Sequence, residues 1–331
     1  MALLTYRQFY YNSLTMIESN TVLVLGAGAS APFGFPIGQA LKDQICKTTL
    51  VAPQSNILEA LGFKKEEIDS FRESLANSGR SSVDAFLENR EDFLDIGKAA
   101  IAIALLPHET TSRLFKDWIL KRETPDLFPE GNWYDLLFGV LGDGVSFDEF
   151  DKHKLSIITF NYDRSLEHYL FTSLKNSYNK TDNECGEILR KIDIVHVHGS
   201  LGPLDWQSRP ADLPSVPYDS GATQKNVKFA AENIKIVHED VADTPEFTKA
   251  HNILLNSKKI FFLGFGYHPV NLKRLGIGTL EIPHNNLWGT SYGLSLTRKQ
   301  YIGKLNTRLS DKLDCIKPEN VYNFLYNHVV L

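Results

Sequence analysis

Polar side chains suited to catalysis follow two short apolar runs of the chain. Asn161 and Asp163 come directly after the run at residues 155–160, and His198 follows the run at residues 192–197. An amide, a carboxylate and an imidazole can together hold a hydroxyl group, orient a water molecule and accept a proton. An ordinary histidine pKa of about 6.5 leaves the ring mostly neutral at pH 7, so we expect His198 to be a base.

Each of these side chains also has a purely structural interpretation. Asp163 can cap the helix expected at residues 163–173, and this leaves Asn161 as the harder residue to explain structurally. His196 and His198 stand two residues apart, so on a strand they face the same side, where a pair of imidazoles can bind a metal. No third ligand is evident at a useful spacing, and a buried, hydrogen-bonded core histidine is the alternative. We expect no metal, and we favour His198 because it stands at the strand end.

Glycine-rich turns follow two further apolar runs. Gly26-Ala27-Gly28-Ala29-Ser30 follows residues 21–25, and Gly264-Phe265-Gly266 follows residues 259–263. Such turns let backbone N–H groups approach a diphosphate, and two of them fit a dinucleotide held at both ends. The alternative is a tight turn in which glycine serves close packing. A third turn, Gly289-Thr290-Ser291, is expected after a run at residues 286–288.

The glycine pattern departs from two well-known nucleotide-binding signatures. Ala31 takes the third glycine position of the dehydrogenase pattern, and no acidic residue ends a clear second strand about 20 residues further on. The Gly-Lys-Ser/Thr of phosphate-binding NTPase loops is also missing. A Rossmann dehydrogenase is therefore a distant alternative.

Short apolar strands that alternate with helices must position these residues. Strands are expected at the runs named above and at residues 234–237, with helices at residues 37–46, 163–173, 244–255 and 297–305 and a leading helix at residues 6–17. This alternation predicts an α/β fold, with a Rossmann-like, mostly parallel sheet covered on both faces. Functional sites of such sheets lie at the carboxyl ends of the strands.

A helical insertion interrupts this alternation. Helical periodicity runs through residues 65–76, 83–106, 111–121 and 133–141 with few strand signals. We therefore predict one Rossmann-like domain at residues 1–55 and 150–331, and a helical subdomain at residues 56–149. Residues 21–41 carry no charge, but four glycines and two prolines there indicate a strand, a loop and a helix start rather than a membrane span.

Composition excludes several classes of protein. The 331 residues are 43% hydrophobic and 23% charged, as in ordinary globular chains. With 40 acidic and 35 basic residues the net charge is −5, and no basic stripe suggests intrinsic nucleic-acid binding. Cys46, Cys185 and Cys315 form no C-x-x-C pair, which fits a reducing cytoplasm and no local zinc site. We see no signal peptide, so a cytoplasmic protein without membrane association is expected.

Taken in order, the motifs resemble those of the sirtuin family, and more closely the sirtuin-like domains of bacterial anti-phage defence systems. Gly26 to Ser30 is similar to the glycine-rich NAD loop, with Gly34-Phe35-Pro36 in place of Gly-Ile-Pro. Thr159-Phe160-Asn161-Tyr162-Asp163 resembles Thr-Gln-Asn-Ile-Asp, His198-Gly199 matches the catalytic His-Gly, and Gly264-Phe265-Gly266 stands where sirtuins have Gly-Thr-Ser. The resemblance covers residues 21–46 and 155–291.

The resemblance implies a role for each of these residues. Asn161 would hold ribose hydroxyls or orient a water, His198 would be the base, and Asp163 would hold the nicotinamide carboxamide. The diphosphate would lie against Gly26, Ala27, Gly28 and Ser30, near Phe35 and Pro36, and the adenosine side would meet Gly264, Gly266 and Asn271.

The same resemblance implies an activity and partners. NAD would be a substrate rather than a resident cofactor, and the relatives are NADases that deplete cellular NAD in abortive infection. Relatives with a single domain form homo-oligomers or pair with a HerA-type hexameric ATPase. Asp-Phe-Arg is replaced by Ile37-Gly38-Gln39 here, and the two zinc-binding C-x-x-C pairs are missing. Those departures disfavour lysine deacylation, which stays as an alternative beside a non-catalytic module that senses NAD or ADP-ribose.

Overall fold

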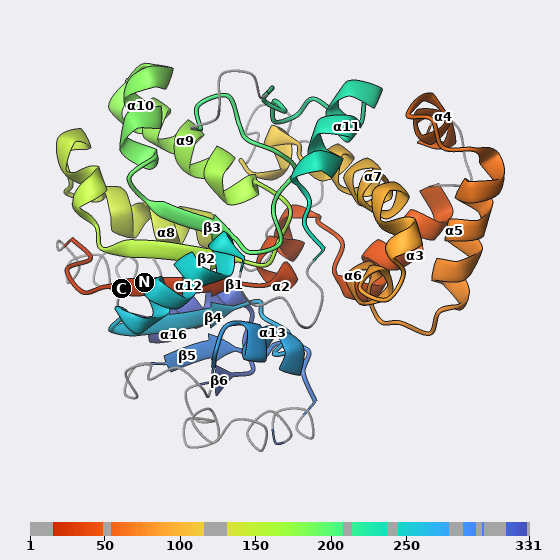
Figure 1. The fold of residues 1–331 in the computed structure, drawn as a ribbon. Helices are drawn as coiled ribbons and strands as arrows, with labels where there is room; N and C mark the ends of the chain where they lie inside the picture. Colours follow the sequence, from red (N-terminus) through yellow and green to blue (C-terminus); the bar gives the residue numbers. More distant parts are fainter. Residues whose placement is uncertain are drawn as a thin grey trace.

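A six-stranded, all-parallel sheet organises the chain (Figure 1). The computed structural model describes residues 16–48, 54–115, 131–207, 214–236, 244–277, 287–295, 300 and 316–329. The strands are β1 (Thr21–Leu25), β2 (Leu155–Thr159), β3 (Asp193–His196), β4 (Lys259–Leu263), β5 (Leu287–Thr290) and β6 (Ile316–Lys317). Their order, β3-β2-β1-β4-β5-β6, is that of a doubly wound Rossmann-like fold. The predicted α/β class is confirmed.

The central strands are apolar because both of their faces are covered. Every residue of β1 is buried, and its neighbours β2 and β4 run parallel to it over their full lengths. Alternate side chains enter two separate cores, so Leu23 and Leu25 belong to one cluster and Val22 and Val24 to the other. A continuous apolar run is the pattern expected for such a strand.

Helices cover both faces of this sheet. On one face lie α8 (Trp133–Gly142), α9 (Ser165–Tyr178) and α16 (Val321–His328), whose apolar side chains join the larger cluster. On the other face, α12 (Pro245–Leu255) and α13 (Pro269–Arg274) contribute to the smaller cluster. The remaining helix of this part is α10 (Asp182–Leu189), which packs on α9.

A helical lobe lies beyond the carboxyl ends of the strands (Figure 1). It consists of α3 (Gly38–Thr48), α4 (Gln54–Ala60), α5 (Lys65–Asn77), α6 (Val83–Leu87) and α7 (Leu94–Leu105). α11 (Gln224–Asn233) packs against α7 although it is distant in sequence. α3 was expected in the Rossmann-like domain, but it packs against α5 and α7 of the lobe. α8 was expected in the helical subdomain, but it lies on the sheet against α9. The lobe and the sheet share the larger apolar cluster.

Three expected elements are corrected by the structure. The helix expected at residues 83–106 is broken, because Asn89 donates to the Ala85 carbonyl at the end of α6 and a new helix starts at Leu94. Of the strand expected at residues 234–237, the described residues 234–236 form a single antiparallel bridge, between Ile234 and Gly199. The turn expected at Gly289 and Thr290 is instead part of β5.

Other expectations fall outside the described residues or are refined. The expected helix at 297–305 and most of the leading helix at 6–17 lie outside them, as do Cys315 and the second half of the helix expected at 111–121. Residues 21–41 form β1, the short helix α2 (Ala27–Ser30), a 3₁₀ turn and the start of α3, as predicted. No helix among the described residues is long and apolar enough to cross a membrane.

Buried histidines make the fold sensitive to mild acid. Burial lowers the pKa of His153, and burial together with Arg164 lowers that of His168 to about 4. Below the unfolded value of about 6.5 the unfolded chain binds more protons than the folded one, so stability falls as the pH drops towards 4. Each group contributes up to about 1.4 kcal/mol per pH unit before allowance for solvent screening.

We expect the free energy of unfolding, measured by urea titration, to fall steadily between pH 6.5 and pH 5. His168→Gln should flatten this dependence relative to the wild type. A stability that is constant over this interval would contradict the assignment. Carboxylate protonation contributes mainly below this window, so the histidines are tested separately.

Candidate functional site

The two glycine turns meet at the point where the strand order reverses. β1 and β4 are neighbours there, and the Gly26 and Gly28 amides donate to the carbonyls of Leu263 and Gly264 at 3.0 and 2.9 Å. A Cβ added at Gly28 would lie 2.8 Å from the Gly264 oxygen. Close backbone packing therefore requires these glycines, and their two N–H groups are engaged with β4 and the turn after it.

The neighbouring positions of the turns are more open. Ala27 and Ser30 line a cavity, and nothing lies within 4 Å of a Cβ added at Gly266, which is exposed. Asn271 is half-buried on α13. Gly266 and Asn271 do not line that cavity, so the residues predicted for the adenosine side stand apart from those predicted for the nicotinamide side.

A cavity of about 90 Å³ lies at the carboxyl ends of β1 and β2. Six of the predicted site residues line it, namely Ala27, Ser30, Phe35, Pro36, Asn161 and Asp163. The helical lobe closes it with Leu41, Ser82, Asp84 and Leu105, and the end of β2 adds Phe160 and Tyr162. Ser82 and Asp84 were not predicted as site residues from the sequence, because only the folded lobe brings α6 to the strand ends.

The side-chain nitrogen of Asn161 is hydrogen-bonded, whereas its side-chain oxygen has no hydrogen-bond partner among the described residues. The Nδ2 group donates to the Gly26 carbonyl at 3.1 Å and to the Ser30 hydroxyl at 2.9 Å. The residue is 9% exposed, and no described group donates to its buried Oδ1 atom. Buried polar atoms are usually hydrogen-bonded, so an acceptor without a partner beside a cavity points to a ligand.

Asp163 is not the N-cap of α9, which is Arg164, but it accepts from the first residue of that helix and also lines the cavity. Its Oδ1 atom accepts hydrogen bonds from the amide of Ser165, at 3.2 Å, and from the hydroxyl of Ser165. Burial raises the pKa of this carboxyl above its usual value, although hydrogen bonding from Ser165 and Ser30 acts in the opposite direction. These contacts are compatible both with a structural role of Asp163 at the start of α9 and with a role in binding a ligand in the cavity.

The two histidines leave the sheet on opposite sides, contrary to expectation. His196 faces α9, where its Nε2 lies 2.6 Å from the Glu167 carboxylate and its Nδ1 lies 2.8 Å from the Asn161 carbonyl. The strand ends at His196, so the alternation of a strand no longer applies to His198. Burial alone would lower the pKa of His196, but the Glu167 carboxylate raises it above the ordinary value.

His198 packs among aromatic rings on the other side. Its ring centroid lies 5.5 Å from that of Phe160 and 6.1 Å from that of Phe247, and its buried Nδ1 has no partner among the described residues. Burial lowers the pKa of His198 to about 4, assisted by Arg274 and opposed by Asp84. An ordinary pKa near 6.5 was expected, but apolar surroundings disfavour the charged ring. His198 does not line the cavity itself. Phe160, whose ring contacts that of His198, does line it.

Gly199 fixes the turn that carries His198. Its φ of +70° is in the left-handed region, and a Cβ there would lie 2.0 Å from the Asn233 carbonyl oxygen. The Lys235 amide donates to the His198 carbonyl at 2.8 Å, so the end of α11 is clamped against this turn. A side chain at Gly199 would displace His198.

We expect Gly199→Ala to lower the free energy of unfolding by at least about 2 kcal/mol more than Gly79→Ala. Gly79 is a matched control, because its φ of +65° carries the same left-handed penalty and nothing lies within 4 Å of an added Cβ. Urea denaturation of both variants measures the difference. Equal losses in the two variants would contradict a steric role for Gly199.

Side chains of α8 form hydrogen bonds with residues that adjoin the site. The Trp133 indole donates to the Ala29 carbonyl at 2.8 Å, and the hydroxyls of Tyr134 and Ser165 share a hydrogen bond of 2.7 Å. Both Trp133 and Tyr134 are 1% exposed. They join the core to the glycine turn and to the beginning of α9.

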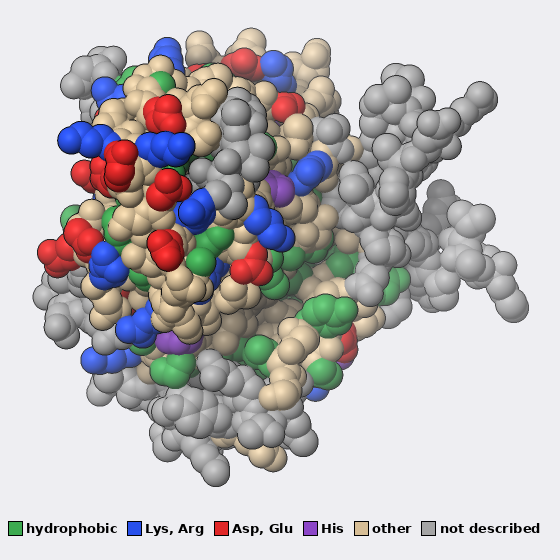
Figure 2. All heavy atoms as spheres, turned by 90° about the vertical axis from the view of Figure 1, so that its right-hand side faces the viewer, with side chains coloured by type: hydrophobic (Ala, Val, Ile, Leu, Met, Phe, Trp, Pro, Cys, Tyr) green, Lys and Arg blue, Asp and Glu red, His purple; other side chains and the backbone are tan. Residues whose placement is uncertain are grey.

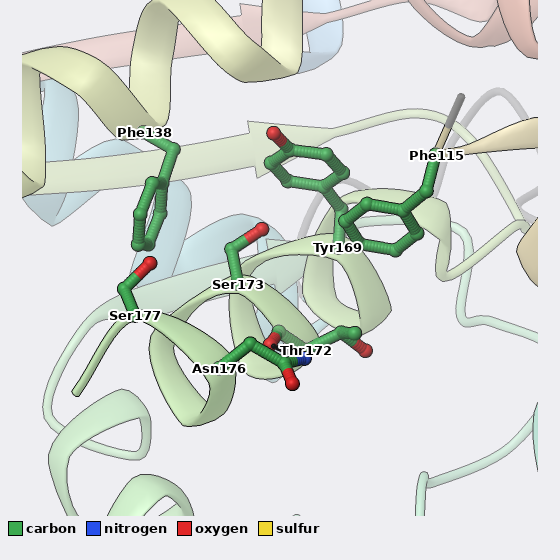
Figure 3. A pocket seen from close by; sticks show the side chains of 7 residues that line it. All are labelled: Phe115, Phe138, Tyr169, Thr172, Ser173, Asn176 and Ser177. Atoms are coloured by element: carbon green, nitrogen blue, oxygen red, sulfur yellow. Dashed lines mark hydrogen bonds between the residues drawn. The ribbon is translucent and has the colours of Figure 1, made fainter. Parts of the chain in front are cut away.

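A larger hollow of about 510 Å³ lies away from the strand ends (Figure 3). Phe115 and Tyr169, whose rings stack with centroids 4.9 Å apart, line it together with Phe138 and small polar residues of α9. No acid, histidine or cysteine lines it among the described residues. The smaller cavity is therefore the better candidate for chemistry.

Acidic and basic side chains intermingle on the described surface in Figure 2. No set of three His, Cys, Asp or Glu side chains in the described part could hold a metal. No protein-family model matches the chain, and no curated protein matches it.

Proposed function

We propose that this protein hydrolyses NAD⁺ to nicotinamide and ADP-ribose. The observation that carries the proposal is a pair of buried atoms, Asn161 Oδ1 and His198 Nδ1, that have no hydrogen-bond partner among the described residues and lie beside the switch point of a Rossmann-like sheet. Nδ1 is an acceptor in the neutral ring whose proton is on Nε2. Ligands of such sheets bind in the crevice at this point. Ribose hydroxyls and water are hydrogen-bond donors, which is what two unused acceptors require.

The proposed reaction makes modest demands on the protein. The nicotinamide of NAD⁺ is a pyridinium cation, so the electron pair of the breaking C1′–N bond neutralises it and no general acid is needed. A water oxygen forms the new bond to C1′, and its proton passes to His198 and then to solvent. Water bound to an oxocarbenium-like carbon is strongly acidic, so a base with a pKa of about 4 suffices.

Asn161 has a positioning task in this scheme. Its amide is oriented by Gly26 and Ser30, so Oδ1 is held in one direction and can accept from a ribose hydroxyl or from the attacking water. Fixed orientation of this kind lowers the entropic part of the barrier. The Asp163 carboxylate oxygen that does not accept from Ser165 can accept a hydrogen bond from the nicotinamide carboxamide.

The cavity is smaller than the dinucleotide. Its 90 Å³ falls below the range of about 300–1,000 Å³ typical of ligand pockets, so binding requires the lobe to move outwards or the remaining nucleotide to lie outside it. A second candidate function is a module that senses NAD or ADP-ribose without turnover, which is favoured by the position of His198, the predicted base, outside the cavity lining. Lysine deacylation has no comparable support.

The cellular role is proposed on the sequence resemblance alone. It comprises NAD⁺ depletion during abortive infection, in bacterial anti-phage defence, by a cytoplasmic homo-oligomer or in a complex with a HerA-type hexameric ATPase.

The deciding experiment measures nicotinamide release from NAD⁺ by the purified protein, with NAD⁺ binding measured in parallel. Release that is lost in both Asn161→Ala and His198→Ala supports hydrolysis at this site. Binding of NAD⁺ or ADP-ribose without release, in the wild type and in His198→Ala alike, supports the sensing module. Neither binding nor release would overturn both functions.

A further inference from the structure

The helical lobe contributes a carboxylate to the cavity. Asp84 lies on α6, and the Tyr162 hydroxyl at the end of β2 donates to its Oδ1 atom. Further along, Glu88 pairs with Arg274 of α13 at 3.0 Å, and that arginine is only 3% exposed. The two contacts fix α6 against β2 and α13, so Asp84 is held at the cavity wall.

The cavity has the chemistry of a site for an aromatic cation. Its described lining holds two carboxylates, Asp84 and Asp163, and neither lysine nor arginine. The rings of Phe35, Phe160 and Tyr162 complete the wall, and aromatic faces attract cations. The two carboxylates disfavour the diphosphate that was expected against Ala27 and Ser30, so a cationic part of the dinucleotide suits this cavity better. The nine-tenths buried Asn161, with its unpartnered Oδ1 atom, independently indicates a ligand in this cavity.

Of the two acids, Asp84 is the better placed to act on the charge of a ligand. Asp163 is committed to Ser165 by two hydrogen bonds, and burial raises the pKa of its carboxyl. Asp84 lines the same cavity as Asn161, so its carboxylate lies close to a predicted reacting group. A charge so placed distinguishes a pyridinium from an uncharged ring of the same size.

We propose that Asp84 selects for the positive charge of the nicotinamide ring, so that the cavity binds oxidised NAD⁺ in preference to NADH and loses its hold on neutral nicotinamide after cleavage. This inference rests on the proposed function, because it places the nicotinamide end of NAD⁺ in the cavity. It adds a specificity-determining residue from the helical lobe.

The test compares matched charged and neutral ligands by calorimetry. The pairs are NAD⁺ with NADH, and 1-methylnicotinamide with nicotinamide. The wild type should prefer the cation of each pair, and Asp84→Asn should lower that preference by at least about tenfold. Asp69→Asn, which removes an exposed carboxylate of α5 paired with Arg72, should keep it.

Tyr162→Phe separates charge from structure. It removes the hydrogen bond to Asp84 but keeps the carboxylate, so the preference for cations should persist. Equal loss of preference in Tyr162→Phe and Asp84→Asn would overturn the proposal in favour of a structural role for the contact.

The outcomes also separate this inference from the proposed function. Nicotinamide release by the wild type, with an unchanged preference in Asp84→Asn, would overturn the role of Asp84 alone. A preference for cations that depends on Asp84, without any nicotinamide release, would support the inference and overturn hydrolysis. A wild type that binds none of the four ligands would overturn both.

Discussion

Asn161→Ala is expected to lower the rate of nicotinamide release by at least about 10²-fold. The substitution removes the buried Oδ1 acceptor of a residue that lines the cavity and also the two donations from Nδ2 to Gly26 and Ser30. The first loss acts on the bound substrate, whereas the second loosens the turn after β1. Steady-state release of nicotinamide measures the effect, with urea denaturation to confirm that the variant is folded.

Ser30→Ala is the matched control for this prediction. It removes one acceptor of the Asn161 amide but leaves Oδ1 and the bond to the Gly26 carbonyl. We expect a clearly smaller loss of activity than in Asn161→Ala. If the two variants were equally impaired, anchoring of the turn rather than the Oδ1 acceptor would explain the role of Asn161.

The sequence was sufficient to predict most of the sheet and one side of the site. Buried parallel strands are short apolar runs, and their carboxyl ends meet at one edge, so residues distant in the chain such as Ser30 and Asn161 could be placed together. The structure indeed joins them by a hydrogen bond of 2.9 Å. Local pattern and fold class were enough for this part.

The remaining features depend on tertiary packing that no local pattern encodes. Asp84 stands in a sequence typical of a helix start, and only the fold of the lobe brings it to Tyr162. The opposite directions of His196 and His198 follow from a strand that ends one residue earlier than expected. Likewise, the hydrogen bond from the Gly28 amide to the Gly264 carbonyl could be predicted only if β1 and β4 were known to be neighbours.

His198→Ala is expected to lower nicotinamide release by about 10²–10⁴-fold, as is typical for loss of a general base. The more specific expectation concerns pH. Because burial lowers the pKa of His198 to about 4, the ring is neutral throughout the range from pH 5 to pH 8. kcat/KM should therefore be flat over that range, without the decline near pH 6.5 that an ordinary histidine would produce.

Phe160→Ala tests the cause of this depressed pKa. Phe160 covers His198 with ring centroids 5.5 Å apart. Its removal admits water, so the pKa of His198 should rise towards 6.5 and an acidic decline should enter the measured range. A decline near pH 6.5 already present in the wild type would contradict the burial argument. Phe138→Ala, at the larger hollow, is the control and should leave the profile flat. A shift confined to Phe160→Ala would mean that an aromatic side chain at this position, rather than the histidine itself, sets the pH range over which the site can work.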